Sequence, residues 1–375
     1  MKLLFIFKSF GNGGVASVMI EKLNYLAERE NFEIHILSEF PNNNITIKRF
    51  TPKIHIHVLS LDHIVLKPRL PIIGYFQLLK DVQIEYQKFI DKLKPDIITG
   101  FNYGYNREII PFLKTKAIKV LELHGAYVSR RLLKKTKRPI DYLRKKTSVL
   151  HNKYDYAITL TQEDTQDRKY LKIPTKHIYN SIFLPAEISL FENRSNIILA
   201  VGTLTHNKNF IDLIKAANKI KEKLKNWQIF ICGEGVEKEF LQNAINEYAL
   251  QDIVILKGHV FDMQALYNNA KLLISTSLSE GFGRTMTEAL SYKIPVIAYD
   301  CKCGPKEIIA DKVNGFVIPF SYEVLAEKIS ELIDDEKKLQ SFSKHSYDDL
   351  NKFYYERIMQ EWVTFYKEIN NQIKD

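Results

Sequence analysis

Short apolar runs alternate with helical patterns along the chain, and this alternation limits the fold more than any other feature. The apolar runs of the first half lie at residues 3–7, 33–37, 54–59, 96–99, 118–123 and 156–160. A helical spacing of apolar residues follows the first run over 20–27 and precedes the fourth over 76–93. Strands that alternate with helices in this way are typical of a parallel sheet with crossover helices.

The pattern stops over residues 174–196, where prolines and polar residues occur without a sustained period, and then starts again. A chain of 375 residues that is 45% hydrophobic can supply two cores, since single domains rarely exceed about 300 residues. We therefore expect an α/β protein with two Rossmann-like doubly wound domains facing across a cleft, over 1–180 and 181–345. The apolar stripe of residues 346–375 predicts a C-terminal helix that packs back on the first domain.

Composition restricts the compartment and the partners. No apolar run approaches the ~20 residues of a membrane-spanning helix, and the N-terminus lacks the small-residue cleavage site of a signal peptide. The three cysteines, Cys232, Cys301 and Cys303, are too few for a disulfide framework, which favours a reducing compartment and a cytoplasmic protein. A net charge of +10 and a pI of about 9.1 favour an anionic partner.

Positive charge concentrates between residues 130 and 146, which contain nine cations and one acid. Four of these cations share one helical face: Arg131, Lys134, Lys135 and Arg138. That spacing suits an anionic surface, so we expect peripheral binding at the inner face of the cell membrane or to a lipid pyrophosphate. A solvated helix with scattered charge is the alternative. Nucleic acid is not expected as a partner, because the aromatic residues are not interleaved with the cations as a stacking platform requires.

A glycine-rich turn, FGNGGVA at residues 10–16, follows the first apolar run and begins a helix. Its spacing, Gly11-x-Gly13-x-x-Ala16, fits the pattern that brings backbone N–H groups close to a pyrophosphate, which makes an NAD-dependent dehydrogenase one reading. The same kind of turn also serves α/β proteins that bind no nicotinamide. The turn alone therefore does not identify the ligand that it binds.

The sharpest motif is EGFGRTMTE, which runs from Glu280 to Glu288. Its two glutamates bracket a turn with Gly281 and Gly283, after which a helix begins whose free N–H groups favour a phosphate. The pair can hold two polyol groups with a diphosphate between them. Taken by itself, the stretch is also compatible with a surface turn and a capping acid.

With this motif, followed by ALSYKIPVIAYD and NGFVIP, nearly the whole chain resembles the family-4 retaining glycosyltransferases, which have the GT-B fold. The resemblance implies that Glu280 contacts the donor sugar and that Glu288 contacts the ribose of the nucleotide. It also implies that the backbone of Gly281, Phe282 and Gly283 contacts sugar and phosphate.

The same resemblance extends to the first half of the chain and to one more loop. It implies that Gly13 and Gly14 lie near the donor phosphates, so the dehydrogenase-like spacing is a coincidence of helix-opening glycines. The histidine of the cleft corresponds to His124, at the end of LELHG. Glu307, in the CGPKE loop, is implied to contact the sugar or the ribose.

One position departs from the family pattern. Where the family has Gly-Arg-Leu and then a lysine five residues after the arginine, this chain has Gly202-Thr203-Leu204 and keeps Lys208. One of the two cations expected on the leaving diphosphate is therefore absent at Thr203. Arg284 is the candidate replacement, and donor affinity should be weak if neither position supplies a charge.

The expected chemistry needs no metal and no other cofactor. The chain contains no Asp-x-Asp, the element of the metal-dependent GT-A alternative. We expect Lys208 and helix N-termini to stabilise the leaving diphosphate, with His124 and Glu280 as the other catalytic residues. No histidine pair has metal-ligand spacing, and His55 with His57 alternate on one strand face, which favours packing.

The expected activity is the transfer of a hexose or N-acetylhexosamine from a nucleotide sugar, most simply a UDP-sugar, to a lipid-linked or surface-polysaccharide acceptor. The resemblance implies retention of the anomeric configuration by front-face attack, with the departing phosphate accepting the proton of the acceptor hydroxyl. A nucleotide-sugar epimerase of the same fold is the alternative, and an NAD-dependent dehydrogenase is a more distant one.

Overall fold

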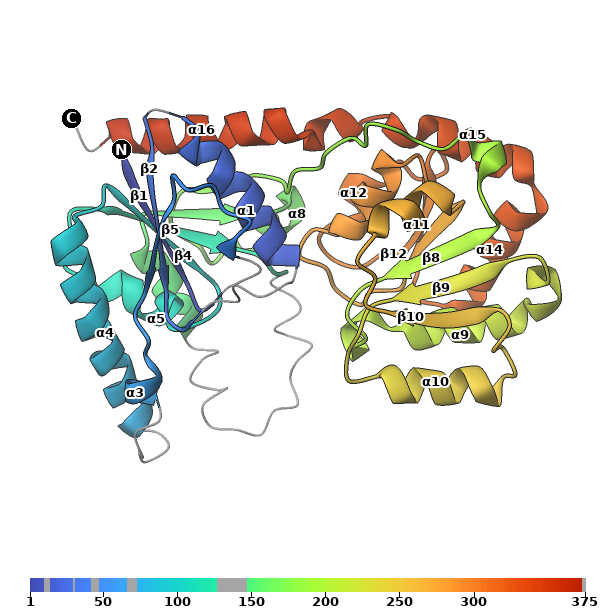
Figure 1. Cartoon of the computed structure of the whole chain (residues 1–375), viewed down its shortest axis with the longest axis horizontal. Helices are drawn as coiled ribbons and strands as arrows, with labels where there is room; N and C mark the ends of the chain where they lie inside the picture. Colours follow the sequence, from blue (N-terminus) through green and yellow to red (C-terminus); the bar gives the residue numbers. More distant parts are fainter. Residues whose placement is uncertain (10–13, 30, 42–46, 66–72, 127–146, 373–375) are drawn as a thin grey trace. The chain divides into compact units, whose positions relative to one another are not determined.

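The structure is a computed structural model that describes residues 1–9, 14–29, 31–41, 47–65, 73–126 and 147–372 (Figure 1). The chain forms two compact units: unit 1 contains Met1–Asn180 and Glu356–Asp375, and unit 2 contains Ser181–Tyr355. The sequence analysis began the C-terminal segment at residue 346, whereas residues 346–355 belong to unit 2. Among the described residues, no helix has both the length and the apolar character that crossing a membrane requires.

Unit 1 contains a seven-stranded parallel sheet with the order β3-β2-β1-β4-β5-β6-β7. Its strands are β1 (Lys2–Phe7), β2 (Glu33–Ser38), β3 (His55–Val58), β4 (Ile97–Phe101), β5 (Ile118–Leu123), β6 (Tyr156–Thr159) and β7 (Thr175–His177). Strands buried on both faces are apolar at almost every position. This is why β1 is a continuous apolar run from Leu3 to Phe7.

Helices cover both faces of this sheet in Figure 1. Within the described residues, the helices of unit 1 are α1 (Gly14–Ala27), α3 (Asp62–Val65), α4 (Ile73–Leu93), α5 (Asn106–Ile109), α8 (Gln162–Asp167) and α16 (Tyr355–Asn371). Helix α16 comes from the far end of the chain and packs into unit 1. The ring of Tyr366 lies edge-on to that of Phe5 in β1, and the ring of Phe365 lies edge-on to that of Tyr156 in β6.

Unit 2 contains a six-stranded parallel sheet with the order β10-β9-β8-β11-β12-β13. Its strands are β8 (Ile197–Val201), β9 (Gln228–Cys232), β10 (Val254–Gly258), β11 (Leu272–Ser275), β12 (Val296–Tyr299) and β13 (Gly315–Ile318). Its helices are α9 (Phe210–Lys219), α10 (Lys238–Glu247), α11 (Met263–Asn269), α12 (Arg284–Ser291), α13 (Pro305–Ile308), α14 (Tyr322–Asp334) and α15 (Glu336–Lys344).

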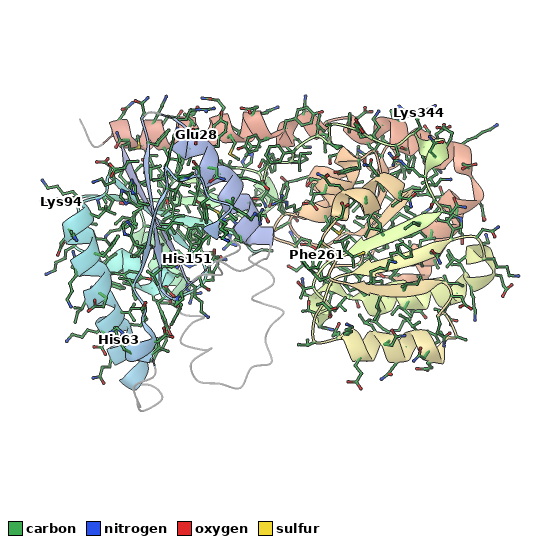
Figure 2. All side chains as sticks on the ribbon, in the orientation of Figure 1. Glu28, His63, Lys94, His151, Phe261 and Lys344 are labelled. Carbon is green, nitrogen blue, oxygen red and sulfur yellow. The ribbon has the colours of Figure 1, made fainter. Side chains whose placement is uncertain are left out.

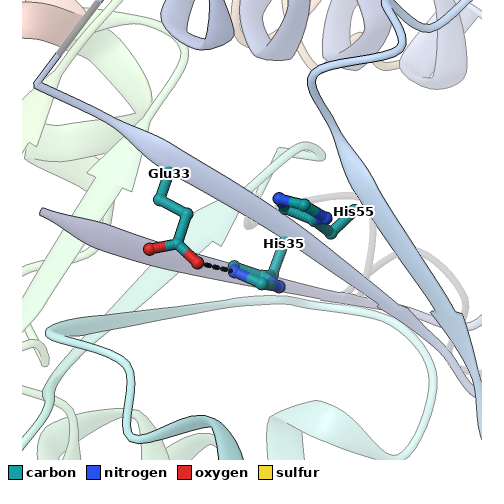
Figure 3. Close-up of side chains that lie close together, drawn as sticks. All are labelled: Glu33, His35 and His55. Carbon is teal, nitrogen blue, oxygen red and sulfur yellow. Dashed lines mark hydrogen bonds and ion pairs between the residues drawn. The ribbon is translucent and has the colours of Figure 1, made fainter.

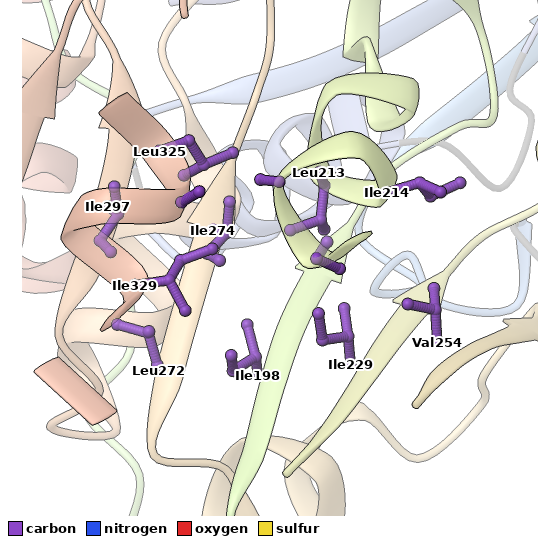
Figure 4. Packing of buried hydrophobic residues seen from close by; sticks show 14 of the residues in the cluster. Ile198, Leu213, Ile214, Ile229, Val254, Leu272, Ile274, Ile297, Leu325 and Ile329 are labelled. Carbon is purple, nitrogen blue, oxygen red and sulfur yellow. The ribbon is translucent and has the colours of Figure 1, made fainter. Parts of the chain in front are cut away.

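The core of unit 2 lies between this sheet and the helices that cover it (Figure 4). Ile198 and Ile274 project from the central strands β8 and β11, and both are buried. They meet Leu213 of α9 and Ile329 of α14 in the same apolar cluster. A sheet packed in this way is rigid, so the loops after its strands have fixed starting points.

The predicted parallel strands are confirmed, with ends that differ by one or two residues. Two strands were missed. Strand β13 at Gly315–Ile318 lies in NGFVIP, which the sequence analysis used only as a motif. The other, β7 at Thr175–His177, lies where the sequence analysis expected only the connection between the domains. It is three residues long, lies at the sheet edge beside β6, and is not buried. A partly exposed strand of that length carries no apolar run by which to recognise it.

Candidate functional site

Two of the predicted site residues meet in unit 2 beyond the carboxyl ends of its strands. Lys208 ends the short turn His206–Lys208 that follows β8, and Glu280 lies in the loop between β11 and α12. The Lys208 Nζ donates a hydrogen bond to Glu280 Oε1 at 2.5 Å, and the two side chains are 21% and 12% exposed. The structure therefore holds a partly shielded ion pair at the edge where ligands bind in open parallel sheets.

Three hydrogen bonds between the two loops fix this ion pair. Thr276 Oγ1 donates to the Lys208 carbonyl at 2.8 Å. Asn207 Nδ2 donates to the Ser279 carbonyl at 2.8 Å, and the Leu278 N–H donates to the Asn207 carbonyl at 2.8 Å. These hydrogen bonds use backbone groups of both loops. The distance between Lys208 and Glu280 is therefore fixed by the packing of the two loops as well as by the two side chains.

Glycines allow the loops after β8 and β9 to pack closely. A Cβ on Gly202 would lie 3.0 Å from Lys208 Cε, so the lysine side chain runs directly over this glycine. Gly233 has a φ of +144°, and a Cβ there would lie 1.9 Å from the Gly202 carbonyl oxygen. Thr203, which stands where the family has an arginine, directly follows Gly202, and its side chain is exposed.

Helix α12 presents the second glutamate of the motif. Gly283, with a φ of +102°, is the N-cap of the helix. Glu288 is bound on both oxygens, because Arg284 Nε donates to Oε1 at 2.7 Å and Tyr267 Oη donates to Oε2 at 3.0 Å. Burial and the Glu288 carboxylate raise the pKa of Tyr267 well above its usual value, so its hydroxyl remains a donor.

The contacts of Glu288 show what Arg284 does in the structure, and Arg284 is the residue suggested to replace the arginine that is absent at Thr203. Arg284 was named as the candidate for that charge, and the structure shows its guanidinium paired with Glu288 four residues along the same helix. The side chain is 23% exposed. Arg284 therefore compensates the carboxylate of the predicted ribose-binding residue, which leaves Lys208 as the cation joined to Glu280.

The loop after β12 packs against the same motif. Gly304 has a φ of +143°, and a Cβ there would lie 1.9 Å from the Phe282 carbonyl oxygen. Burial raises the pKa of the Cys301 thiol to about 12, with Glu280 acting in the same direction and Lys208 opposing it. The three cysteines are buried and form no disulfide. Glu307 lies in the short helix α13 that follows Gly304.

Unit 1 holds His124 at the end of β5. Its Nε2 lies 3.1 Å from Glu122 Oε2, and its ring is tilted against that of Phe101 at 5.5 Å. Gly14 is the first residue of α1, and a Cβ there would meet no atom within 4 Å. The other predicted residues of this half lie outside the described residues, namely Gly13, Arg131, Lys134, Lys135 and Arg138.

A cluster of imidazoles lies on one face of β2 and β3 in unit 1 (Figure 3). The candidate ligand atoms of Glu33, His35 and His55 lie within 4.8 Å of one another. However, the rings of His35 and His55 are stacked 4.7 Å apart with an interplanar angle of 20°. An imidazole binds a metal through a lone pair in the plane of its ring, so two stacked rings do not aim at one ion. The cluster is consistent with packing, and His57 continues the stack.

Sequence reasoning missed three ionisable residues that the structure places in unit 1. Glu39 follows β2 and is fully buried, and Lys22 of α1 forms a buried ion pair with Glu122 of β5. The available signal was a charged residue within a mostly apolar strand, such as Glu122 in IKVLEL, or on the apolar side of a helix. Outside the core, large apolar side chains also remain exposed, such as Phe261 after β10 (Figure 2).

Comparison with known proteins gives the relatives of this chain. Residues 186–349 match the sequence model of the family described as Glycosyl transferases group 1. The amylovoran biosynthesis glycosyltransferase AmsD of Erwinia amylovora is 31% identical over 177 residues, which are 46% of this chain and 48% of that protein. The match therefore spans about half the length of that relative. An uncharacterized glycosyltransferase of Methanocaldococcus jannaschii is 28% identical over 353 residues, which cover 79% of this chain and 85% of that one.

The fold is shared over nearly the whole chain with solved structures. HepE from Anabaena, crystallised with UDP and glucose, superposes with a TM-score of 0.77 at 18% identity, covering 98% of this chain and 99% of that chain. This confirms the predicted GT-B fold with two Rossmann-like parallel-sheet domains.

Proposed function

Because residues 186–349 match the sequence model of the group 1 glycosyl transferases, we propose that this chain is a retaining glycosyltransferase that uses a UDP-sugar without a metal. The transferred group is a hexose or N-acetylhexosamine, and the acceptor is a lipid-linked or surface polysaccharide. The observation that carries the proposal is the Lys208–Glu280 ion pair, held by hydrogen bonds between the loops after β8 and β11.

The chemistry needs a cation beside the leaving group and a polar group beside the sugar. The bond between the anomeric carbon and the diphosphate breaks, and its electron pair leaves with the diphosphate. The acceptor hydroxyl oxygen forms the new bond on the same face of the sugar, and its proton passes to the departing phosphate. Lys208 would stabilise the negative charge that grows on the diphosphate, and Glu280 would accept hydrogen bonds from the sugar hydroxyls.

Support for a UDP donor comes from a structural neighbour and from the motif. HepE was solved with UDP and glucose, and it has the fold of this chain. In this chain Glu288 is the acid that would bind the ribose hydroxyls, and Arg284 and Tyr267 hold its two oxygens in place. The backbone of Gly281, Phe282 and Gly283 leads into α12 and would meet the sugar and the phosphates.

The acceptor side of the proposal rests on charge and on one relative. AmsD is named for amylovoran biosynthesis. The cations at Arg131, Lys134, Lys135 and Arg138 would bring this chain to an anionic membrane surface, where each exposed cation contributes about 1 kcal/mol. Replacing the four residues with glutamine should release the protein from anionic vesicles and spare transfer to a soluble acceptor analogue.

The test is a panel of nucleotide sugars incubated with the protein and a lipid-linked or oligosaccharide acceptor, with products read by mass. We expect one UDP-sugar to be used, the product to keep the anomeric configuration of the donor by NMR, and the rate to persist in excess EDTA. Manganese-dependent recovery of a rate lost to EDTA would contradict metal independence. Release of an epimerised sugar without acceptor would support the epimerase, and nicotinamide binding would support the dehydrogenase.

A further inference from the structure

A fully buried ion pair lies beside His124 in unit 1. Lys22 of α1 and Glu122 of β5 are each 1% exposed, and Lys22 Nζ donates to Glu122 Oε1 at 2.5 Å. Moving two charges out of water is costly, and a protein with well-packed apolar residues of similar size in their place is often as stable or more so. The pair is therefore poorly explained by stability, and its place at a strand end points to an electrostatic role.

The second oxygen of Glu122 faces the histidine. Burial by itself raises the pKa of Glu122, but the Lys22 ammonium and the hydrogen bond with His124 outweigh it and hold the pKa below its usual value. Glu122 is therefore a carboxylate at neutral pH, which can accept hydrogen bonds but cannot donate one. The His124 Nε2, 3.1 Å from Glu122 Oε2, must carry the proton. In the neutral ring the acceptor is then Nδ1, for which no partner is found among the described residues.

The cation of the pair is enclosed by aromatic rings. Lys22 Nζ lies 3.8 Å from the ring centroid of Trp362 in α16 and 5.2 Å from that of Phe5 in β1. A desolvated cation over an indole is stabilised by the negative face of the ring. Burial lowers the pKa of Lys22, and the carboxylate of Glu122 acts in the opposite direction. The ammonium is thus fixed between the carboxylate and the C-terminal helix.

Two tyrosines complete the described surroundings of the carboxylate. Burial and, after it, the Glu122 charge raise the pKa of Tyr103 and of Tyr366, so both phenols stay neutral. Tyr103 follows β4, and Tyr366 lies on α16 with its hydroxyl 3.5 Å from Thr99 Oγ1. Lys22 is the cation that faces Glu122 within the described part of the chain.

We propose that Lys22 and Glu122 are positioning residues that hold His124 as the neutral Nε2–H tautomer, with Nδ1 presented to a sugar hydroxyl. Glu122 fixes the tautomer and the ring orientation. Lys22 balances the charge of Glu122 and holds the carboxylate in place beside the ring. The inference rests on the proposed function, in which His124 meets the sugar, and extends it to two residues outside the family motifs.

The variant Glu122→Gln tests the tautomer directly. The Lys22 ammonium has only donors, so it would take the amide oxygen, and the amide NH₂ would then face His124 Nε2. The proton would move to Nδ1, which could no longer accept. With 15N-labelled histidine, NMR should show the Nε2–H form in the wild type and the Nδ1–H form in the variant. Turnover of the donor selected by the panel should fall about 100-fold with KM nearly unchanged, as expected for a misplaced group.

A double variant separates positioning from stability. Lys22→Met with Glu122→Leu removes both charges together and should fold at least as well as the wild type, yet lose turnover like Glu122→Gln. Lys119→Met, also on β5, is the matched control and should retain both the tautomer and the rate. A folded double variant with wild-type turnover, or an unchanged tautomer in Glu122→Gln, would overturn the inference. Absence of transfer by the wild type would refute the proposed function alone, because the NMR result does not depend on activity.

Discussion

Lys208 is the residue whose charge the proposed reaction uses most. In the structure its ammonium is neutralised by Glu280, so the diphosphate must compete for it. Because charge on the leaving group is greatest in the transition state, Lys208→Met should reduce turnover more than donor affinity, by about 2–4 kcal/mol in the barrier. Steady-state kinetics and calorimetric titration with UDP separate the two effects. Lys219→Met, an exposed lysine of α9, should change neither, and equal losses in turnover and affinity would show that Lys208 only binds the ground state.

Glu39 is a second residue whose environment gives a measurable consequence. Its Oε1 accepts hydrogen bonds from Tyr86 Oη at 2.6 Å and from the backbone N–H groups of Tyr105 and Asn106 at 2.9 and 3.2 Å. Its Oε2 is buried and has no hydrogen-bond partner among the described residues. Burial outweighs these donors and raises the pKa of Glu39 to about 7.

This pKa predicts that unit 1 is more stable in mild acid than at pH 8. Between pH 4.5 and about 7 the folded protein holds a proton that the unfolded chain releases, so the free energy of unfolding falls as the pH rises. The full shift corresponds to about 3 kcal/mol. Hydrogen exchange of the β1 and β4 amides at pH 5.5 and 8, corrected for intrinsic rates, measures it. Glu39→Gln should flatten the dependence, and Glu28→Gln, at an exposed position (Figure 2), should not. Equal slopes in all three proteins would refute the assignment.

At the scale of elements, glycines at the strand ends determine how closely the site loops pack. Gly304 has a φ of +143° and lies against the Phe282 carbonyl, so an added Cβ meets both an unfavourable backbone conformation and a clash. Gly304→Ala should lower the free energy of unfolding of unit 2 by more than about 2 kcal/mol and weaken UDP binding. Gly14→Ala is the control for folding, because its Cβ enters open space. Thermal unfolding and UDP titration give the two results, and an unchanged Gly304→Ala protein would contradict the tight packing.

The sequence indicated the strands more reliably than the contacts between side chains. The predicted strand at 118–123 coincides with β5, because a strand buried on both faces is largely apolar, as Ile118, Val120, Leu121 and Leu123 are here. The i,i+4 spacing of Arg284 and Glu288 could also have indicated their ion pair. By contrast, the contact of Lys22 with Glu122 depends on which helix crosses which strand, and periodicity carries no such information. The roles of Lys208 and Glu280 stay predictions, although the structure brings the two residues together.

At the scale of the whole molecule, the two units differ in how the chain builds them. Unit 2 is one continuous segment, Ser181–Tyr355, whereas unit 1 is completed by residues from the end of the chain (Figure 1). The buried side chains that α16 contributes include Trp362, Phe365, Tyr366 and Ile369. At about 1.5–3 kcal/mol for each large side chain, their burial is comparable with the whole stability of a typical domain, about 5–15 kcal/mol.

The fragment 1–180 should therefore fail to fold, whereas the fragment 181–355 should fold alone. Circular dichroism and NMR of the separate fragments test both expectations. Without α16, the Lys22 ammonium would also lose the Trp362 ring, which leaves a buried charge less well enclosed. Joining residues 356–372 to fragment 1–180 through a long flexible linker should restore its fold, because the helix would again cover the apolar surface. The same fusion with Trp362 and Tyr366 replaced by serine should not. A cooperative, folded fragment 1–180 without the helix would show that α16 is an accessory to this unit and not part of its core.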